Sequence, residues 1–236
     1  MSSVAVGIFC KTPAAGFSKT RLSPPLRPQD CSAISACFIH DLASTIDSLG
    51  GAAAPYAIYT PAGTEPALRA LLPASFQLLA QSGGDFGARL SQAITQLLEA
   101  GHRGAILVNA DSPTLPASIL QAAVDALGHE DAVVLSPSFD GGYTLIGLSR
   151  PHPELFAGIP WSTANVHRMT MQRAAEIGVP VINVPGWYDV DDGQTLQLLR
   201  RELAGERLPF AEPGATGADA PATRQLLARM LAAVGG

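Results

Sequence analysis

The stretch VAVGIFCKTPAAGFSKTRL, residues 4–22, joins a continuous apolar run to a loop rich in glycine, hydroxyl and basic side chains. A short apolar run that ends at a Pro- and Gly-containing loop is typical of a buried strand, here over residues 4–10. The loop over residues 11–28 leads into a helix expected at about 30–49, where apolar residues recur every three or four positions. A buried strand, a loop and an amphipathic helix together form the repeating unit of a parallel sheet.

The same alternation continues along the chain. Further strands are expected at residues 57–60, 76–80, 105–109, 132–136, 143–148 and 179–184. Further helices are expected at residues 65–72, 86–98, 116–127, 165–177 and 193–203. The predicted fold class is therefore α/β, a three-layer α/β/α sandwich with a mainly parallel sheet. Ligands of such sheets bind outside the carboxyl ends of the strands, so the loops after strands are the candidate sites.

Composition places limits on the function. The 236 residues are 47% hydrophobic and 15% charged, which excludes global disorder. The net charge of −5 argues against nucleic-acid binding. No apolar run reaches the length of a membrane span, and the N-terminus lacks the pattern of a secretory signal. We therefore expect a soluble, cytoplasmic protein.

Residues 1–204 are expected to form one domain. Residues 205–236 form an Ala-, Gly- and Pro-rich linker followed by a helix over residues 221–234. The apolar stripe of this helix predicts that it packs on its own domain, and a homodimer through the helix is the alternative.

The loop after the first strand is the first candidate site, with Lys11, Gly16, Lys19, Thr20 and Arg21. The chain has 15 lysine and arginine residues, and its two lysines both fall in this loop. Several donors and positive charges beside a glycine suit a diphosphate. The loop has no GK[ST] sequence and so is not a Walker A loop. An exposed basic loop without a ligand is the alternative interpretation.

The segment QSGGDFGAR, residues 81–89, is the second candidate. Gln81, Gly83 and Gly84 precede a helix, and Arg89 lies in its first turn. Glycines let the backbone approach a flat ligand, and a helix start favours an anion. A glycine turn with Asp85 as the helix cap explains the segment equally well.

Acidic residues follow several of the later strands. Asp111 stands at the carboxyl end of the most hydrophobic strand, where a carboxylate can hold Mg²⁺ or Mn²⁺ against phosphate oxygens; a cap is the alternative. Asp140 opens the sequence DGGY, which a tight turn would also use for its backbone geometry. Asp189 and Asp191 supply a second metal ligand or a base, or cap the last helix of the domain.

These segments, taken in order, resemble the bacterial DUF2064 family, also described as radical-SAM/selenodomain-associated or glycosyltransferase-A-like transferases. The resemblance covers residues 4 to about 203. It rests on FCKTP (9–13), Gly16, KTRL (19–22), QSGGDFGAR (81–89), ADSP (110–113), DGGY (140–143), WST (161–163) and YDVD (188–191). It implies the nucleotide-diphospho-sugar transferase fold, which is related to glycosyltransferase-A enzymes and to cofactor guanylyltransferases.

The resemblance also implies how the site is divided. The basic loop would bind nucleotide phosphates, and Gln81 with its two glycines would read the base. Asp111 would hold the divalent ion, with Asp189 or Asp191 completing the metal site. The acceptor side would be formed by the following residues: Gly141, Gly142, Tyr143, Trp161, Ser162 and Thr163. The Asp-x-Asp pair common in glycosyltransferase-A enzymes is replaced here by Asp111-Ser112-Pro113.

The sequence thus predicts a metal-dependent transferase that uses a nucleoside diphosphate-sugar donor and a small-molecule acceptor. Asp111 and Asp191 are the predicted metal ligands, and Asp140 or Asp189 would orient or deprotonate the acceptor hydroxyl. One alternative is a nucleotidyltransferase, which takes a nucleoside triphosphate and a phosphorylated acceptor and releases pyrophosphate. A less favoured alternative is a nucleotide-binding protein without turnover.

Overall fold

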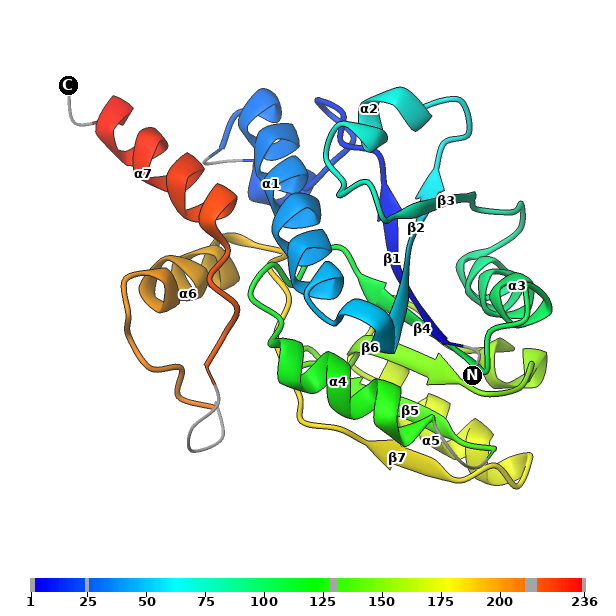
Figure 1. Ribbon diagram of the computed structural model, residues 1–236. Coiled ribbons are helices and arrows are strands. Elements are labelled where there is room, and N and C mark those ends of the chain that lie inside the picture. Colours follow the sequence, from blue (N-terminus) through cyan, green and yellow to red (C-terminus); the bar gives the residue numbers. More distant parts are fainter. Residues whose placement is uncertain (1–2, 24–25, 128–130, 211–215, 235–236) are drawn as a thin grey trace.

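The apolar run that opens the chain forms an inner strand of a seven-stranded sheet (Figure 1). The computed structural model describes residues 3–23, 26–127, 131–210 and 216–234. Its strands are β1 (Val4–Lys11), β2 (Ala53–Thr60), β3 (Gln77–Ala80), β4 (Gly104–Asn109), β5 (Val133–Pro137), β6 (Tyr143–Leu148) and β7 (Val181–Asn183). Its helices are α1 (Pro28–Asp47), α2 (Glu65–Arg69), α3 (Phe86–Glu99), α4 (Ala117–Ala126), α5 (Val166–Glu176), α6 (Gly193–Leu203) and α7 (Pro221–Val234). Short 3-10 helices are η1 (Thr20–Leu22), η2 (Gly50–Ala52) and η3 (Pro153–Phe156).

The sheet is mainly parallel, as predicted. Its strand order is β3-β2-β1-β4-β6-β5-β7, and β6 runs antiparallel to both of its neighbours, β4 and β5. The reversal arises because β5 and β6 are joined by a tight turn over residues 138–142, which returns the chain at once. That turn therefore lies at the sheet edge where the parallel strands β1, β4 and β5 end.

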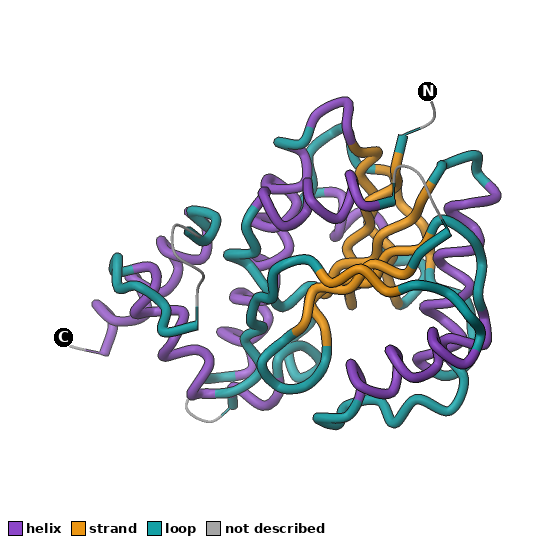
Figure 2. The backbone as a smooth tube through the Cα atoms, turned by 90° about the horizontal axis from the view of Figure 1, so that it is seen from below, coloured by secondary structure: helices purple, strands orange, loops and turns teal. Residues whose placement is uncertain are grey.

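Helices cover both faces of the sheet (Figure 2). On one face, Phe38 of α1, Val124 of α4 and Leu199 of α6 are buried in the same apolar cluster. On the other face, Ile94 of α3 and Ala174 of α5 are buried in a second cluster, together with residues of η3. The two clusters separated by the sheet confirm the predicted α/β/α sandwich.

The tail helix α7 lies beside α1 and α6 (Figure 1). Leu227 is buried, and the Asp41 carboxylate of α1 accepts the backbone N–H groups of Ala222 at 3.0 Å and Thr223 at 2.8 Å. The apolar stripe of α7 is thus used within the chain, and the homodimer stays a prediction. Among the described residues, none of the helices has the length and hydropathy that a membrane span requires.

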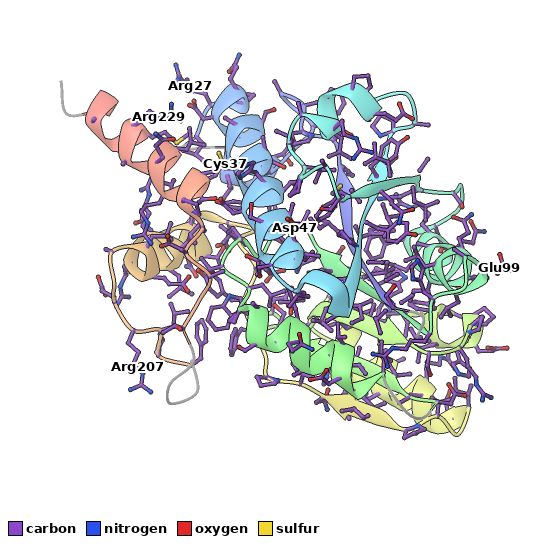
Figure 3. The ribbon with its side chains drawn as sticks, viewed as in Figure 1. Arg27, Cys37, Asp47, Glu99, Arg207 and Arg229 are labelled. Atoms are coloured by element: carbon purple, nitrogen blue, oxygen red, sulfur yellow. The ribbon has the colours of Figure 1, made fainter. Side chains whose placement is uncertain are left out.

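The α1–α7 contact continues outward to Cys37 and Arg229, which Figure 3 labels on these two helices. Burial raises the pKa of the Cys37 thiol, and the Arg229 charge offsets part of that rise. Helix α7 therefore runs beside α1 beyond its first turn (Figure 3).

Candidate functional site

A cavity of about 670 Å³ opens at the sheet edge where β1 and β4 end, beside the β5–β6 turn. Its walls include these predicted site residues: Lys11, Lys19, Thr20, Arg21, Gln81, Arg89, Asp111, Asp140, Gly142, Tyr143, Trp161, Ser162, Thr163, Asp189 and Asp191. The predicted glycines Gly16, Gly83, Gly84 and Gly141 are not among the lining residues. Segments that are far apart in the sequence therefore meet around one space.

Lys19 lies at the centre of the charged part of this cavity. Its ammonium is 2.8 Å from Asp111 Oδ1 and 2.9 Å from Asp191 Oδ1, and it donates a hydrogen bond of 2.6 Å to the carbonyl oxygen of Val190. The Lys19 side chain is only 6% exposed. Burial disfavours its charge, but the attraction of the two carboxylates prevails and raises the pKa of Lys19. Lys19 was predicted to bind phosphate, yet here it neutralises the predicted metal ligands.

The local backbone explains how these groups meet. Lys19 itself has left-handed geometry, with φ 50° and ψ 40°, directly before η1. The Val190 N–H donates to the Asp111 carbonyl oxygen at 2.9 Å, which joins the segment before α6 to the end of β4. Asp192 forms a capping box with Thr195 at the start of α6. Of the acidic residues after β7, Asp192 is therefore the helix cap, while Asp189 and Asp191 are left to face the cavity.

Asp189 is the cavity carboxylate whose pKa is shifted by its surroundings. Burial, followed by the charges of Asp140 and Asp191, raises the pKa of Asp189 to about 6. The Ser138 hydroxyl donates to Asp189 Oδ1 at 2.9 Å and partly offsets this rise. Arg21 lies 3.8 Å from Asp191 Oδ2, with a side chain that is 70% exposed. Among the described residues, Lys19 and Arg21 are thus the two cations that form ion pairs with carboxylates of this cavity.

Gln81 is committed to the protein backbone. Its amide donates at 3.0 Å to the carbonyl oxygens of both Cys10 and Ile58, which belong to β1 and β2. Its Oε1 accepts a hydrogen bond of 2.9 Å from Arg89 Nη1. Asp85 caps α3 by accepting the Ala88 N–H at 2.8 Å, so the capping alternative for this segment is confirmed. Base reading by the Gln81 side chain stays a prediction. Both N–H groups of its amide are already used, so only Oε1 could form a further hydrogen bond, as an acceptor.

An aromatic wall completes the cavity, and of its three rings only Trp161 was among the predicted site residues. Phe86 packs edge-on against Phe9 at 5.7 Å and against Trp161 at 5.0 Å between ring centroids. The Arg89 guanidinium lies 5.6 Å from the Phe86 ring centroid. Gly87 permits this packing, because a Cβ there would lie 3.0 Å from the Trp161 Nε1 atom. The sequence feature that could have indicated this wall is Phe86, a large apolar residue at the exposed start of α3.

The DGGY segment forms the turn between β5 and β6. Gly141 has φ +89°, and an added Cβ would lie 2.2 Å from the carbonyl oxygen of Ala164. Asp140 Oδ1 accepts the Gly142 N–H at 2.8 Å, which aims this carboxylate across its own turn. The DGGY segment therefore forms the tight turn and also places Asp140 in the cavity wall.

The WST segment, residues 161–163, lies in the loop before helix α5. Helix α5 begins at Val166 with Asn165 at its N-cap, so neither Ser162 nor Thr163 is the cap. Ser162 has φ 62°, and the Thr163 hydroxyl donates to the Pro160 carbonyl oxygen at 2.7 Å. This folded loop presents the half-buried Trp161 to the cavity.

The donor set can be compared with the needs of a divalent ion. Asp111, Asp191 and the Val190 carbonyl supply oxygen atoms, which Mg²⁺ and Mn²⁺ prefer. Within the described part of the chain, no three His, Cys, Asp or Glu side chains are grouped as a ready metal site. The chemistry of the oxygens fits a divalent ion, and the Lys19 ammonium now occupies the point on which they converge.

Comparison with known proteins agrees with this architecture. Residues 48–163 match the family described as "Uncharacterized protein conserved in bacteria (DUF2064)". No curated protein matches the chain. Among solved structures, the chain is similar to a protein from Desulfovibrio desulfuricans G20 described as a candidate nucleotide-diphospho-sugar transferase. The identity is 28%, the TM-score is 0.83, and the match covers 98% of this chain and 96% of that one.

Two further solved structures share the fold at lower identity. A cytidylyltransferase from Leptospira borgpetersenii serovar Hardjo-bovis is 9% identical with a TM-score of 0.56, covering 100% of this chain and 96% of that one. Glucosyl-3-phosphoglycerate synthase from Mycobacterium tuberculosis, in complex with Mn²⁺, uridine diphosphate and glucosyl-3-phosphoglycerate, is 12% identical with a TM-score of 0.50, covering 99% and 80%. These matches confirm the predicted resemblance to the DUF2064 family, found over residues 48–163, and the predicted fold, that of the nucleotide-diphospho-sugar transferases.

Proposed function

We propose that the protein is a divalent-metal-dependent transferase that uses a nucleoside diphosphate-sugar donor and a small-molecule acceptor. The observation that carries this proposal is a single cavity in which a basic loop and a carboxylate cluster face the DGGY turn and Trp161. The description of the Desulfovibrio relative supports the donor class. The Mn²⁺ and uridine diphosphate bound by the Mycobacterium synthase support the metal and the nucleotide.

The basic loop would bind the donor's diphosphate. Lys11 and Arg21 are exposed and line the cavity, so their donors are available to phosphate oxygens. The Arg21 guanidinium lies 3.8 Å from Asp191 Oδ2, at the carboxylate end of the cavity. These cations would stabilise the charge that develops on the departing diphosphate, which is generally the largest contribution to such catalysis.

The carboxylates would serve the metal and the acceptor. Asp111 and Asp191 would hold the divalent ion, which when bound neutralises charge on the diphosphate oxygens. Asp140 or Asp189 would orient the acceptor hydroxyl or accept its proton. Asp189 is held by Ser138 and Asp140 by the Gly142 N–H, so each carboxylate has a fixed position in the cavity wall.

A nucleotidyltransferase is the second candidate. The likeness to the Leptospira cytidylyltransferase favours it, since that fold accommodates nucleotidyl transfer as well. The reactions differ in their products: sugar transfer releases a nucleoside diphosphate, whereas nucleotidyl transfer from a triphosphate releases pyrophosphate.

The proposal is tested by the melting temperature of the protein with a panel of nucleotides and nucleotide sugars, each with and without Mn²⁺. A ligand at about 100 times its Kd stabilises the folded state by about 2.7 kcal/mol. We expect a metal-dependent shift with a nucleoside diphosphate-sugar that is lost in Asp111→Asn and kept in the control Asp125→Asn, an exposed carboxylate on α4. A shift confined to a triphosphate, with pyrophosphate as product, would assign nucleotidyl transfer instead. Tight binding without product from any acceptor would indicate a binding protein.

A further inference from the structure

Lys19 has the surroundings of a bound cation rather than of a surface lysine. Three oxygen atoms, from Asp111, Asp191 and Val190, lie between 2.6 and 2.9 Å from its ammonium. The Phe38 ring lies beneath it, with the centroid 5.8 Å from Nζ. The ammonium therefore has oxygen contacts on one side and an aromatic face on the other, and its side chain is nearly excluded from solvent.

The same oxygens cannot serve two cations at once. A divalent ion bound by Asp111 Oδ1 and Asp191 Oδ1 would sit about 2.0–2.2 Å from each oxygen. Such an ion would lie in contact with an ammonium that is 2.8 and 2.9 Å from the same two atoms. Two positive charges at that separation repel strongly in a partly buried site. One cation must leave before the other can bind these oxygens.

We propose that Lys19 is the resident cation of the Asp111–Asp191 pair, and that a divalent ion displaces its ammonium into the cavity. The proposal rests on the proposed function for the choice of ion. Asp140 and Asp189 line the same cavity as the pair, and a divalent ion neutralises a group of carboxylates better than a single ammonium does.

The displaced ammonium would join the binding surface for phosphate. Lys19 belongs to the loop that also presents Lys11 and Arg21, and all three line the cavity. Its long unbranched stem can turn without a change of backbone. Occupation of the carboxylates by the ion would thus supply one more cation to a diphosphate, so binding of the metal would strengthen binding of the nucleotide.

The two lysines of the chain allow a direct test on the unmodified protein. Lys11 is exposed and serves as the internal reference for Lys19. Reductive methylation followed by mass spectrometry measures the rate at each lysine. Without metal, Lys19 is expected to react far more slowly than Lys11. Saturating Mn²⁺ is expected to raise the rate at Lys19 several-fold and to leave Lys11 unchanged. A Lys19 that stays protected in saturating Mn²⁺ would overturn the displacement.

The second test measures Mn²⁺ affinity from the electron paramagnetic resonance signal of the free ion. Removing the competing charge in Lys19→Met is expected to tighten Mn²⁺ binding at least about tenfold, whereas Arg103→Met, at an exposed cation outside the cavity lining, stays near wild type. Methionine keeps the length of the side chain against Phe38, and circular dichroism confirms folding. Equal or weaker Mn²⁺ binding by Lys19→Met would overturn the exchange while leaving the metal site intact. Failure of every variant and of wild type to bind Mn²⁺ would overturn both the exchange and the metal-dependent function.

Discussion

The carboxylate of Asp41 fixes the C-terminal helix to the body of the domain, and its removal should have a large and local effect. Asp41 is 2% exposed on α1, and its two oxygens accept the N–H groups of Ala222 and Thr223 at the start of α7. These N–H groups have no partner within their own helix, since the first turn of any helix leaves its donors unpaired. A side chain about 180 residues earlier therefore supplies the N-terminal cap of α7.

The expected cost of Asp41→Ala follows from these contacts. A hydrogen bond to a charged group contributes about 1.5–3 kcal/mol, and loss of an ordinary helix cap costs about 0.5–2 kcal/mol. Thr223 is fully buried, so water does not replace the lost acceptor there, whereas the half-buried Ala222 keeps partial access to water. We expect the free energy of unfolding to fall by about 2–4 kcal/mol, with about half that loss in Asp41→Asn, which retains one acceptor oxygen.

Urea denaturation measures the total loss, and hydrogen exchange localises it. The amides of Ala222 and Thr223 should lose protection in Asp41→Ala, while those of α3 should not. Asp47→Asn, at the exposed end of the same helix, is the matched control and should change stability by less than about 0.5 kcal/mol. A loss below about 1 kcal/mol with these two amides still protected would refute the assigned role of Asp41.

Three further outcomes are expected. Gly141→Ala should lower the free energy of unfolding by at least about 2 kcal/mol in the same urea titration, because it adds a clash with the backbone to a positive φ. The control Gly16→Ala, with φ +78° and open space around it, should lower it by only about 1 kcal/mol. Equal losses in the two variants would contradict the clash. Burial raises the pKa of Glu202 above its usual 4.5, so the native state holds this proton more tightly than the unfolded state. Stability should therefore fall as the pH rises from 4.5 through the raised pKa, and Glu202→Gln should remove that part of the dependence, measured by urea titrations across this range. Asp140→Asn keeps an oxygen that accepts the Gly142 N–H, so the melting temperature should stay unchanged. Turnover, measured as nucleoside diphosphate released, should fall at least about a hundredfold. Unchanged turnover would show that Asp140 has no catalytic role.

The strands and most helices could be predicted because apolar periodicity is a local property. The start of β2 shows the limit of such reasoning. Proline lacks an N–H and is disfavoured in inner strands, and the strand expected at residues 57–60 began only after Pro55. The strand in fact begins at Ala53, because β3 pairs with β2 only from Tyr56 onward, which leaves Pro55 on a stretch bonded to β1 alone.

The candidate site was predictable as a set of residue types at strand ends, and much less so as a set of contacts. The motifs placed Lys19, Asp111 and Asp191 at one sheet edge, since carboxyl ends of parallel strands meet there. That the ammonium lies between the carboxylates depends on the left-handed backbone at Lys19, which no sequence pattern indicated. The role of Gln81 as a bridge between β1 and β2 likewise depends on how the strands pair.

The aromatic wall has a practical consequence for following this protein in solution. The chain contains two tryptophans, and they occupy opposite environments. Trp187 is 1% exposed in the core, whereas Trp161 is half-buried at the cavity in contact with Phe86. A ligand that enters the cavity alters the surroundings of one indole and leaves the other as it was. A change in the intrinsic tryptophan fluorescence of the protein would therefore report that a ligand occupies the cavity, before any turnover is found.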